Sequence, residues 1–274
     1  MTNFRVGKTK FVDETNRISF IFDGKKYFGY KGDTLASALI ANGIHLVGRS
    51  FKYHRPRGIM SCGSEEANAI FQVADNTDRT EPNVRATELE IYEGLNVKSQ
   101  NCWPSVNFDI GGVNNFISPF IPAGFYYKTF MWPKSFWKNV YEPLIRKSAG
   151  LGKSPTQPDP DLYDHRHIHC DVLVIGGGIS GIIAAKISAE NNKKTILIDD
   201  KNHLGGSTIY QDDENYKIND SKTKDWLEEQ IKELKNCKNL IIKNRTSIAA
   251  YHGYNYLLAK ENLTDHLSED KKNN

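Results

Sequence analysis

The sequence has 274 residues, with 36 Lys and Arg against 33 Asp and Glu, a formal net charge of +3 and 39% hydrophobic residues. This length allows one or two domains with buried cores, and the near balance of charge argues against a dedicated nucleic-acid binder. The cysteines, Cys62, Cys102, Cys170 and Cys237, form no C-x-x-C pair, which argues against a disulfide framework or a structural zinc. Neither a signal peptide nor an apolar run long enough to cross a bilayer is present. We therefore predict a cytoplasmic protein with no membrane or nucleic-acid partner.

A small α+β domain is predicted over residues 17–97, after an N-terminal extension of residues 1–16. Residues 17–31 alternate apolar and polar side chains around Asp23-Gly24, the pattern of a β-hairpin whose turn needs positive φ. Asp33 or Thr34 can then cap a helix through LASALIANG that stops at Gly43. Further strands are expected at Ala69–Val73 and Thr87–Tyr92. Hairpin, helix and short strands together indicate a β-grasp-like fold.

A basic loop lies inside this domain. It holds five potentially cationic side chains in ten residues, interleaved with aromatic rings: Arg49, Lys52, His54, Arg55 and Arg57. Arg49, Lys52, Arg55 and Arg57 are candidates to grip a phosphate or flavin. The alternatives are a nucleic-acid patch and an internally salt-bridged loop with Glu65 and Glu66 as partners. For the nearby Cys62 we expect a packed small side chain rather than a reactive thiol.

Residues 98–170 form a connector rich in aromatic residues and proline. A flexible linker would instead be rich in Gly, Ser or charge, so we expect irregular chain packed at an interface. Trp103, Trp132 and Trp137 are expected to pack at that interface rather than to stack on a flavin. The alternating His165, His167 and His169 are interpreted as a solvated lead-in to the next strand rather than as a zinc site.

Residues 171–274 begin like a dinucleotide-binding domain. Val172–Ile175 is a buried-strand pattern, followed by Gly176, Gly178 and Gly181 in the G-x-G-x-x-G arrangement at the start of a helix. That helix N-terminus offers N–H groups and about +0.5 charge to a pyrophosphate. Asp199 ends the second strand, Thr195–Ile198, where a carboxylate can bond a ribose hydroxyl. The predicted cofactor-binding residues are Gly176, Gly177, Gly178, Ile179, Ser180, Gly181, Asp199, Asp200, Gly205 and Gly206.

The chain after Gly206 predicts a helix at Asp225–Lys235 and strand-like runs LIIK and SIAAYHGYNYLLAK, the second turning at His252-Gly253. No further parallel strand is expected, so this part is interpreted as the front of a truncated Rossmann-type domain, and the chain as a fragment with weak or no NAD binding by itself. The glycine pattern alone slightly favours FAD over NAD.

Longer motifs carry a family resemblance. Five stretches stand out: GDTLASALIANG (32–43), GRSFKYHRPRGI (48–59), GSEEANAI (63–70), SQNCWPS (99–105) and AGFYYKTFMWP (123–133). Together with the glycine pattern they resemble the alpha subunit of heterotetrameric sarcosine oxidase. The resemblance implies oxidative demethylation of sarcosine to glycine, with hydrogen peroxide and either formaldehyde or methylene-tetrahydrofolate as the other products. It also implies NAD in the glycine-rich domain, and a beta subunit and other subunits as partners. FAD and the amine-oxidising site would lie on the beta subunit, FMN at the interface with it, and no catalytic residue on this chain.

The N-terminal domain also resembles a plant-type ferredoxin. The C-x₄-C-x₂-C spacing of such domains, started at Cys62, puts the next ligands at Ala67 and Ile70 and the fourth near Thr87. We therefore expect a ferredoxin-like domain without an iron–sulfur cluster.

Two other functions stay open. The chain could be a subunit of an FAD-dependent amine or opine dehydrogenase, or a non-catalytic scaffold that holds the flavin of its partner. The sequence does not separate sarcosine from dimethylglycine or another N-methyl amino acid as substrate.

Overall fold

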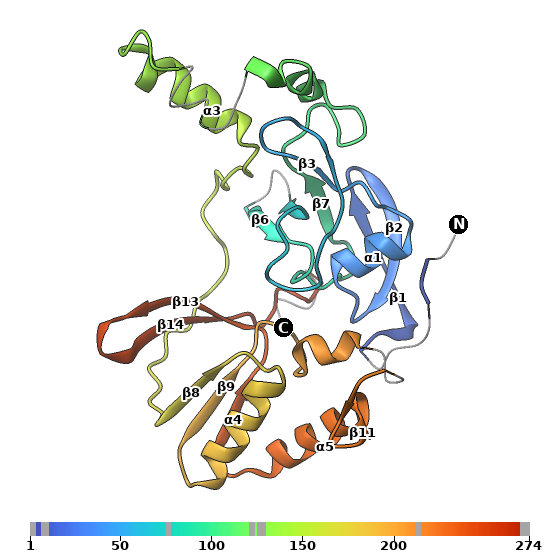
Figure 1. The fold of residues 1–274 in the computed structure, drawn as a ribbon, viewed down its shortest axis with the longest axis vertical. Helices are drawn as coiled ribbons and strands as arrows, with labels where there is room; N and C mark the ends of the chain where they lie inside the picture. The colour runs from blue at the N-terminus through green and yellow to red at the C-terminus, as the bar shows by residue number, and fades with distance from the viewer. Residues whose placement is uncertain are drawn as a thin grey trace. The chain divides into compact units, whose positions relative to one another are not determined.

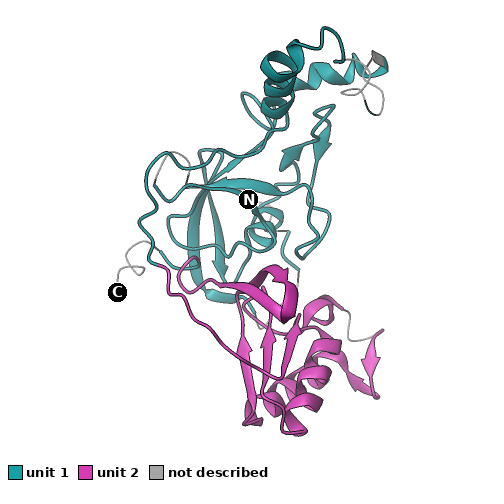
Figure 2. Ribbon diagram, turned by 90° about the vertical axis from the view of Figure 1, so that its left-hand side faces the viewer, with its two compact units in different colours: residues 1–162, 266–274 teal, residues 163–265 magenta. Residues whose placement is uncertain are grey.

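The structure is a computed structural model that describes residues 4–6, 11–74, 78–120, 124, 130–211 and 215–268. The chain divides into two compact units, coloured separately in Figure 2. Unit 1 comprises Met1–Leu162 with His266–Asn274, and unit 2 comprises Tyr163–Asp265. Figure 1 follows the elements along the chain.

Unit 1 is built on a five-stranded sheet of order β2-β1-β7-β5-β6. β7 runs parallel to β1, whereas the β1–β2, β5–β6 and β5–β7 pairs are antiparallel. This mixed sheet agrees with the predicted α+β class. The strands are β1 (Asp13–Phe22), β2 (Lys25–Lys31), β5 (Ile70–Val73), β6 (Glu81–Arg85) and β7 (Asn96–Ser99).

The predicted hairpin turn also fastens the sheet. Asp23 and Gly24 have φ of 48° and 75°, the positive values that a two-residue turn between β1 and β2 requires. The Asp23 carboxylate accepts hydrogen bonds from the Ser99 backbone N–H and hydroxyl, both at 2.7 Å. The turn therefore fixes the end of β7 as well as the hairpin.

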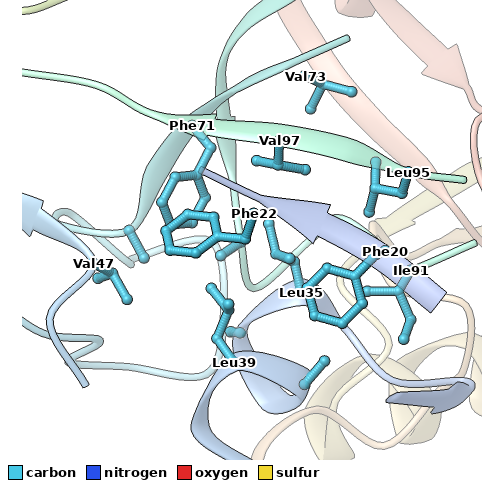
Figure 3. Close-up of a cluster of buried hydrophobic side chains, with 14 of the residues drawn as sticks. Phe20, Phe22, Leu35, Leu39, Val47, Phe71, Val73, Ile91, Leu95 and Val97 are labelled. Carbon is cyan, nitrogen blue, oxygen red and sulfur yellow. The ribbon is translucent and has the colours of Figure 1, made fainter. Parts of the chain in front are cut away.

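Helix α1 (Leu35–Ala41) covers the sheet as predicted. The Thr34 hydroxyl accepts a bond from Ser37 N–H at 3.2 Å, and Gly43 has a φ of +76° just after the helix. Figure 3 shows the core between helix and sheet, where Leu35, Leu39, Phe20 and Phe71 are at most 1% exposed. Side chains buried to this degree stabilise the fold by roughly 1.5–3 kcal/mol each.

The predicted strand at Thr87–Tyr92 is wrong. Residues 86–88 form a turn in which Glu88 and Leu89 donate backbone bonds to Arg85 O. The Thr87 hydroxyl donates to Gly63 O at 2.7 Å. The apolar alternation therefore comes from a turn anchored to another loop, and β5 pairs instead with β6 and β7.

The basic loop is a short hairpin of β3 (Gly48–Arg49) and β4 (Pro56–Arg57). The connector after β7 contains more regular structure than predicted, and in its described residues this is mainly short helices. These are the 3₁₀ turns η1 (Ile110–Asn115) and η2 (Ser118–Phe120), the π-helical turn η3 (Trp137–Tyr141) and α3 (Glu142–Ser148).

Unit 2 contains a parallel sheet of order β12-β9-β8. The expectation of no further parallel strand is wrong, because the LIIK run forms β12, in register with β9. Ile182 and Leu197 are fully buried, and Leu234 is 1% exposed, in the core that helices and sheet share. The elements are β8 (Val172–Ile175), α4 (Ile179–Glu190), β9 (Thr195–Ile198), α5 (Thr223–Asn236) and β12 (Leu240–Lys243).

The remaining elements of unit 2 are short 3₁₀ turns and the strands of two two-stranded sheets. They are η4 (Gly206–Tyr210), β10 (Lys217–Ile218), β11 (Ser221–Lys222), β13 (Thr246–His252), η5 (Gly253–Asn255) and β14 (Tyr256–Glu261). Across both units, no helix in the described ranges combines the length and apolar character needed to cross a membrane.

Candidate functional site

The glycine turn after β8 is the centre of the candidate site. Gly176 has a φ of +100°, a conformation that L side chains rarely adopt. Its N–H donates to Ile198 O at 2.8 Å, which closes the carboxyl ends of β8 and β9 together. The backbone therefore turns sharply between strand and helix.

The first turn of α4 packs directly on that glycine turn. A Cβ on Gly181 would lie 1.8 Å from Gly176 O, so only glycine permits this approach. Gly178 is the N-cap and makes no side-chain capping bond. The first N–H groups of a helix have no intrahelical acceptors, and together with the helix dipole they attract an anion. Ile179, Ser180 and Gly181 provide these groups here.

A second glycine pair lies against the first turn. Gly205 N–H donates to Gly177 O at 2.8 Å, and Gly205 and Gly206 have φ of +132° and +55°. A Cβ on Gly206 would come within 2.9 Å of Gly178 Cα. Two side-chain-free stretches of backbone therefore meet beside the α4 N-terminus.

The Asp199 carboxylate fixes the backbone of the glycine turn through hydrogen bonds. Asp199 is 8% exposed, and its carboxylate accepts the Gly177 N–H at 2.5 Å and the Lys201 N–H at 2.9 Å. The adjacent Asp200 is half-buried. Burial and the neighbouring Asp199 carboxylate raise the pKa of Asp200. Asp199 thus fixes the glycine turn, while ribose binding by either carboxylate stays a prediction.

The structure brings the predicted glycines and Asp199 into one cluster, and it adds Leu204. A Cβ on Gly177 would lie 2.4 Å from Leu204 Cδ2, and Leu204 is 4% exposed. The Leu204 side chain packs against the glycine turn at Gly177. Its sequence signal is an apolar residue directly before the second glycine pair.

The predicted phosphate or flavin contacts lie in unit 1, and Arg49 ties its loop to the connector. Its guanidinium donates to Val106 O at 2.8 Å, His54 O at 3.2 Å and Asn107 O at 3.3 Å. Arg55 donates to Asn115 Oδ1 at 2.8 Å. Lys52 Nζ lies 4.8 Å from the Tyr53 ring centroid, and Arg57 is exposed on β4. Phosphate binding by these four side chains stays a prediction.

Sequence reasoning missed a buried hydrogen bond between His54 of this loop and a distant carboxylate. His54 Nδ1 lies 2.7 Å from Asp109 Oδ2, and the Asp109 side chain is 1% exposed. Asp109 Oδ1 also accepts the Trp103 and Gly111 N–H groups. These partners are about 55 residues apart in sequence, so no local pattern reveals them.

The expectation for Cys62 is wrong, and Glu66 does not take the role that the salt-bridged alternative gave it. Cys62 is exposed rather than packed, and Glu66 is 2% exposed rather than a surface partner of the basic loop. The Glu66 carboxylate accepts the N–H groups of Met60, Ser61, Asn68 and Ala69 at 2.7–3.1 Å. The loop therefore folds around the glutamate, which takes the buried position.

Two parts of the chain match known protein families. Residues 15–102 match the 2Fe-2S iron–sulfur cluster binding domain, and residues 171–271 match the FAD dependent oxidoreductase family. The second match covers the whole glycine site.

Curated relatives match nearly the entire chain. The sarcosine oxidase subunit alpha of Rhizobium meliloti (strain 1021) is 45% identical over 98% of this chain. That of Corynebacterium sp. (strain U-96) is 27% identical over 93%. The chain spans 27% and 22% of the lengths of these two proteins. The resemblance found in the sequence motifs is confirmed.

A solved structure shows the same fold. L-proline dehydrogenase from P. horikoshii aligns with a TM-score of 0.52 and 18% identity, over 94% of this chain and 38% of that one. The likeness supports the two-part architecture and carries no functional assignment.

The predicted cofactor set is corrected by the family matches. The expectation of no iron–sulfur cluster is contradicted, because unit 1 matches a 2Fe-2S binding domain. For the dinucleotide, unit 2 matches a family described as FAD dependent, and the choice between NAD and FAD stays a prediction.

The match to a 2Fe-2S binding domain can be compared with the metal-ligating side chains among the described residues. A 2Fe-2S cluster takes four soft ligands, and the thiols of unit 1 are Cys62 and Cys102. No group of three or more His, Cys, Asp or Glu side chains that could hold a metal occurs among the described residues, His165, His167 and His169 included. The donor set of the described residues does not supply the four ligands of a 2Fe-2S cluster.

Proposed function

We propose that the chain, which is similar to sarcosine oxidase alpha subunits over nearly its entire length, is the dinucleotide-binding and assembly part of such a subunit. The reaction is the oxidative demethylation of sarcosine to glycine. Hydrogen peroxide and either formaldehyde or methylene-tetrahydrofolate are the other products. The oxidised bond is the C–N bond of an N-methyl amino acid.

The observation that carries the proposal is the bare backbone at the α4 N-terminus. Gly178 and Gly206 face each other without side chains, and a Cβ on Gly178 would have only Gly206 Cα at 4.0 Å. A pyrophosphate can approach the main chain here and accept bonds from the first N–H groups of α4. The residues present therefore fit the ADP half of FAD.

FAD, when bound, supplies the capacity to accept a hydride equivalent from the carbon next to the amine nitrogen. The chain's own residues orient and hold the dinucleotide. Asp199 keeps the Gly177 N–H fixed, Leu204 supports the turn, and Gly181 keeps α4 against it. The adenosine ribose is expected near Asp199 and Asp200, where a hydroxyl can donate to a carboxylate.

The same proposal includes assembly with a second polypeptide, the beta subunit of sarcosine oxidase, and with the other subunits of a heterotetramer. It is supported by the names of the relatives, which are subunits, and by exposed aromatic side chains in the connector. Trp103 and Trp132 are 69% and 82% exposed. Exposed apolar surface of this kind is typical of protein interfaces.

A titration tests the dinucleotide site. Gly178→Ala adds one methyl group to the cradle with ordinary contacts around it, so the fold should persist while the pyrophosphate is blocked. We expect FAD affinity, followed by quenching of flavin fluorescence, to fall at least about tenfold, or 1.4 kcal/mol. Gly253→Ala, at an open position in the same unit, is the matched control and should bind as the wild type does.

Equal FAD affinity for Gly178→Ala and wild type would contradict the proposed site. A parallel titration with NAD measures selectivity, and binding of NAD in preference to FAD would contradict the cofactor assignment.

A further inference from the structure

The helical segment of residues 136–148 carries an exposed apolar strip. Phe136, Val140 and Leu144 are spaced four residues apart, which places them along one side of the helix. They are 46%, 37% and 59% exposed. None of the residues of η3 or α3 is buried. The described chain thus provides no core for this helix.

A helix this short needs tertiary packing. Isolated helices below about 12–15 residues are marginal in water, and in proteins most helix stability comes from burying an apolar face. Tyr141 gives local support: its hydroxyl donates to Trp132 O at 2.8 Å, and its ring packs at 5.1 Å from that of Phe130 and 6.1 Å from that of Phe136. These contacts stiffen the π-helical turn but leave the strip open.

The chain just after α3 is held firmly to the body of unit 1. Gln72, 5% exposed, exchanges two hydrogen bonds with the Lys153 backbone, both at 2.8 Å. Gly152 N–H donates to Asn83 Oδ1 at 2.9 Å. A Cβ on Gly150 would lie 2.1 Å from Asn101 Oδ1. The base of the helix is therefore fixed, as expected of an element that presents a surface rather than of a loose linker.

The charge around the strip restricts the occupant. Residues 134–148 carry four basic side chains, Lys134, Lys138, Arg146 and Lys147, and one acidic side chain, Glu142. Glu142 is paired with Arg146 at 3.1 Å. A second copy of the chain meeting this face in a two-fold dimer would bring like charges together. An apolar groove rimmed by carboxylates would complement both the strip and its surroundings.

We propose that the strip Phe136, Val140 and Leu144 docks into an apolar, acid-rimmed groove on the partner subunit of the assembly. This inference rests on the proposed function, because the partner is the beta subunit proposed there. The mode is an amphipathic helix laid into a groove, with side chains at helical spacing as anchors. Lys138 and Lys147 would meet the rim and guide association.

The test measures binding of the chain to purified sarcosine oxidase beta subunit by calorimetry. Leu144→Asp places a charge in the strip, and Asn139→Asp places the same charge at an exposed neighbouring position. We expect at least a tenfold loss of affinity for Leu144→Asp and less than a threefold change for Asn139→Asp. Both variants should unfold at the wild-type temperature, because neither position is buried.

Each contrary result has a separate meaning. Equal affinity for Leu144→Asp and wild type would overturn the docking helix alone. Failure of the wild-type chain to bind the beta subunit would overturn the docking helix and the assembly part of the proposed function, while leaving the FAD titration unaffected. Sedimentation with anionic phosphatidylglycerol vesicles that Leu144→Asp abolishes, with beta-subunit binding unchanged, would assign the strip to a membrane surface and overturn the proposal.

Discussion

Glu66 and Asp199 are carboxylates that organise loops through main-chain N–H groups. Both are almost fully buried, and a buried charge is tolerated only when hydrogen bonds compensate its lost hydration. Glu66 receives four backbone N–H bonds and Asp199 receives two. Each therefore sets the shape of a glycine-containing loop by accepting hydrogen bonds from its main chain.

Replacing Glu66 by Gln should destabilise unit 1. The amide group turns one acceptor oxygen into a donor that faces backbone N–H donors, so buried groups are left without acceptors. We expect a loss of about 2–3 kcal/mol in the free energy of unfolding, measured by urea denaturation. Glu65→Gln, at an exposed position, should change it by less than about 0.5 kcal/mol. Similar values for the two variants would contradict the role of Glu66.

The same carboxylate should make unit 1 acid-sensitive. Burial alone would raise the pKa of Glu66, but the N–H bonds from Asn68, Ser61, Met60 and Ala69 outweigh it, and the pKa lies below its usual value. The stabilisation is then complete above the unfolded pKa of about 4.3 and is lost as the pH falls through the lower folded pKa. Urea midpoints from pH 7 to pH 3 should fall more steeply for wild type than for Glu66→Gln. Parallel curves would count against this linkage.

At the scale of elements, turn residues, helix caps and apolar runs correctly predicted the helices and strands whose positions depend on nearby residues. The β1–β2 hairpin, α1, β8, α4 and β9 all lie where turn residues, caps and apolar runs placed them, because these signals act within a few residues. The glycine cluster was predictable for the same reason.

The elements that the sequence analysis missed depend on distant partners. The turn at residues 86–88 is held by Gly63, and the basic loop is held by Val106 and Asp109. Helix α3 contains a proline near its start and no buried residue. Its sequence therefore lacks the apolar pattern of a helix packed against a core, by which it could have been predicted. The pairing of β12 with β9 was missed because a four-residue apolar run does not reveal its neighbour.

Gly181→Ala should separate α4 from the glycine turn. The added Cβ would meet Gly176 O at 1.8 Å, a backbone contact that no rotamer change relieves. Overpacking of this kind costs about 1–3 kcal/mol or more, so unit 2 should melt at a lower temperature by circular dichroism and bind FAD weakly. Gly253→Ala, with open space around it, should melt as the wild type does. A wild-type melting temperature for Gly181→Ala would show that α4 does not pack as described.

At the scale of the whole molecule, each unit has a hydrophobic core of its own. Phe71 is fully buried in unit 1, with its ring 5.3 Å from that of Phe22, and Leu197 is fully buried in unit 2. Neither core cluster contains residues of the other unit. Two cores in one chain allow separate unfolding transitions, for which a single free energy is not defined.

Phe71→Ala should therefore loosen one unit alone. Removing a buried phenylalanine ring costs about 3–5 kcal/mol, and the loss should fall on the sheet of unit 1. Peptide-resolved hydrogen exchange should show faster exchange in β1, β5 and β7, with β8, β9 and α4 protected as in the wild type. Leu197→Ala is the reciprocal variant and should expose β8, β9 and α4 at a cost of about 2–5 kcal/mol. If either substitution accelerated exchange equally in both sets of strands, the two cores would unfold together as one cooperative unit.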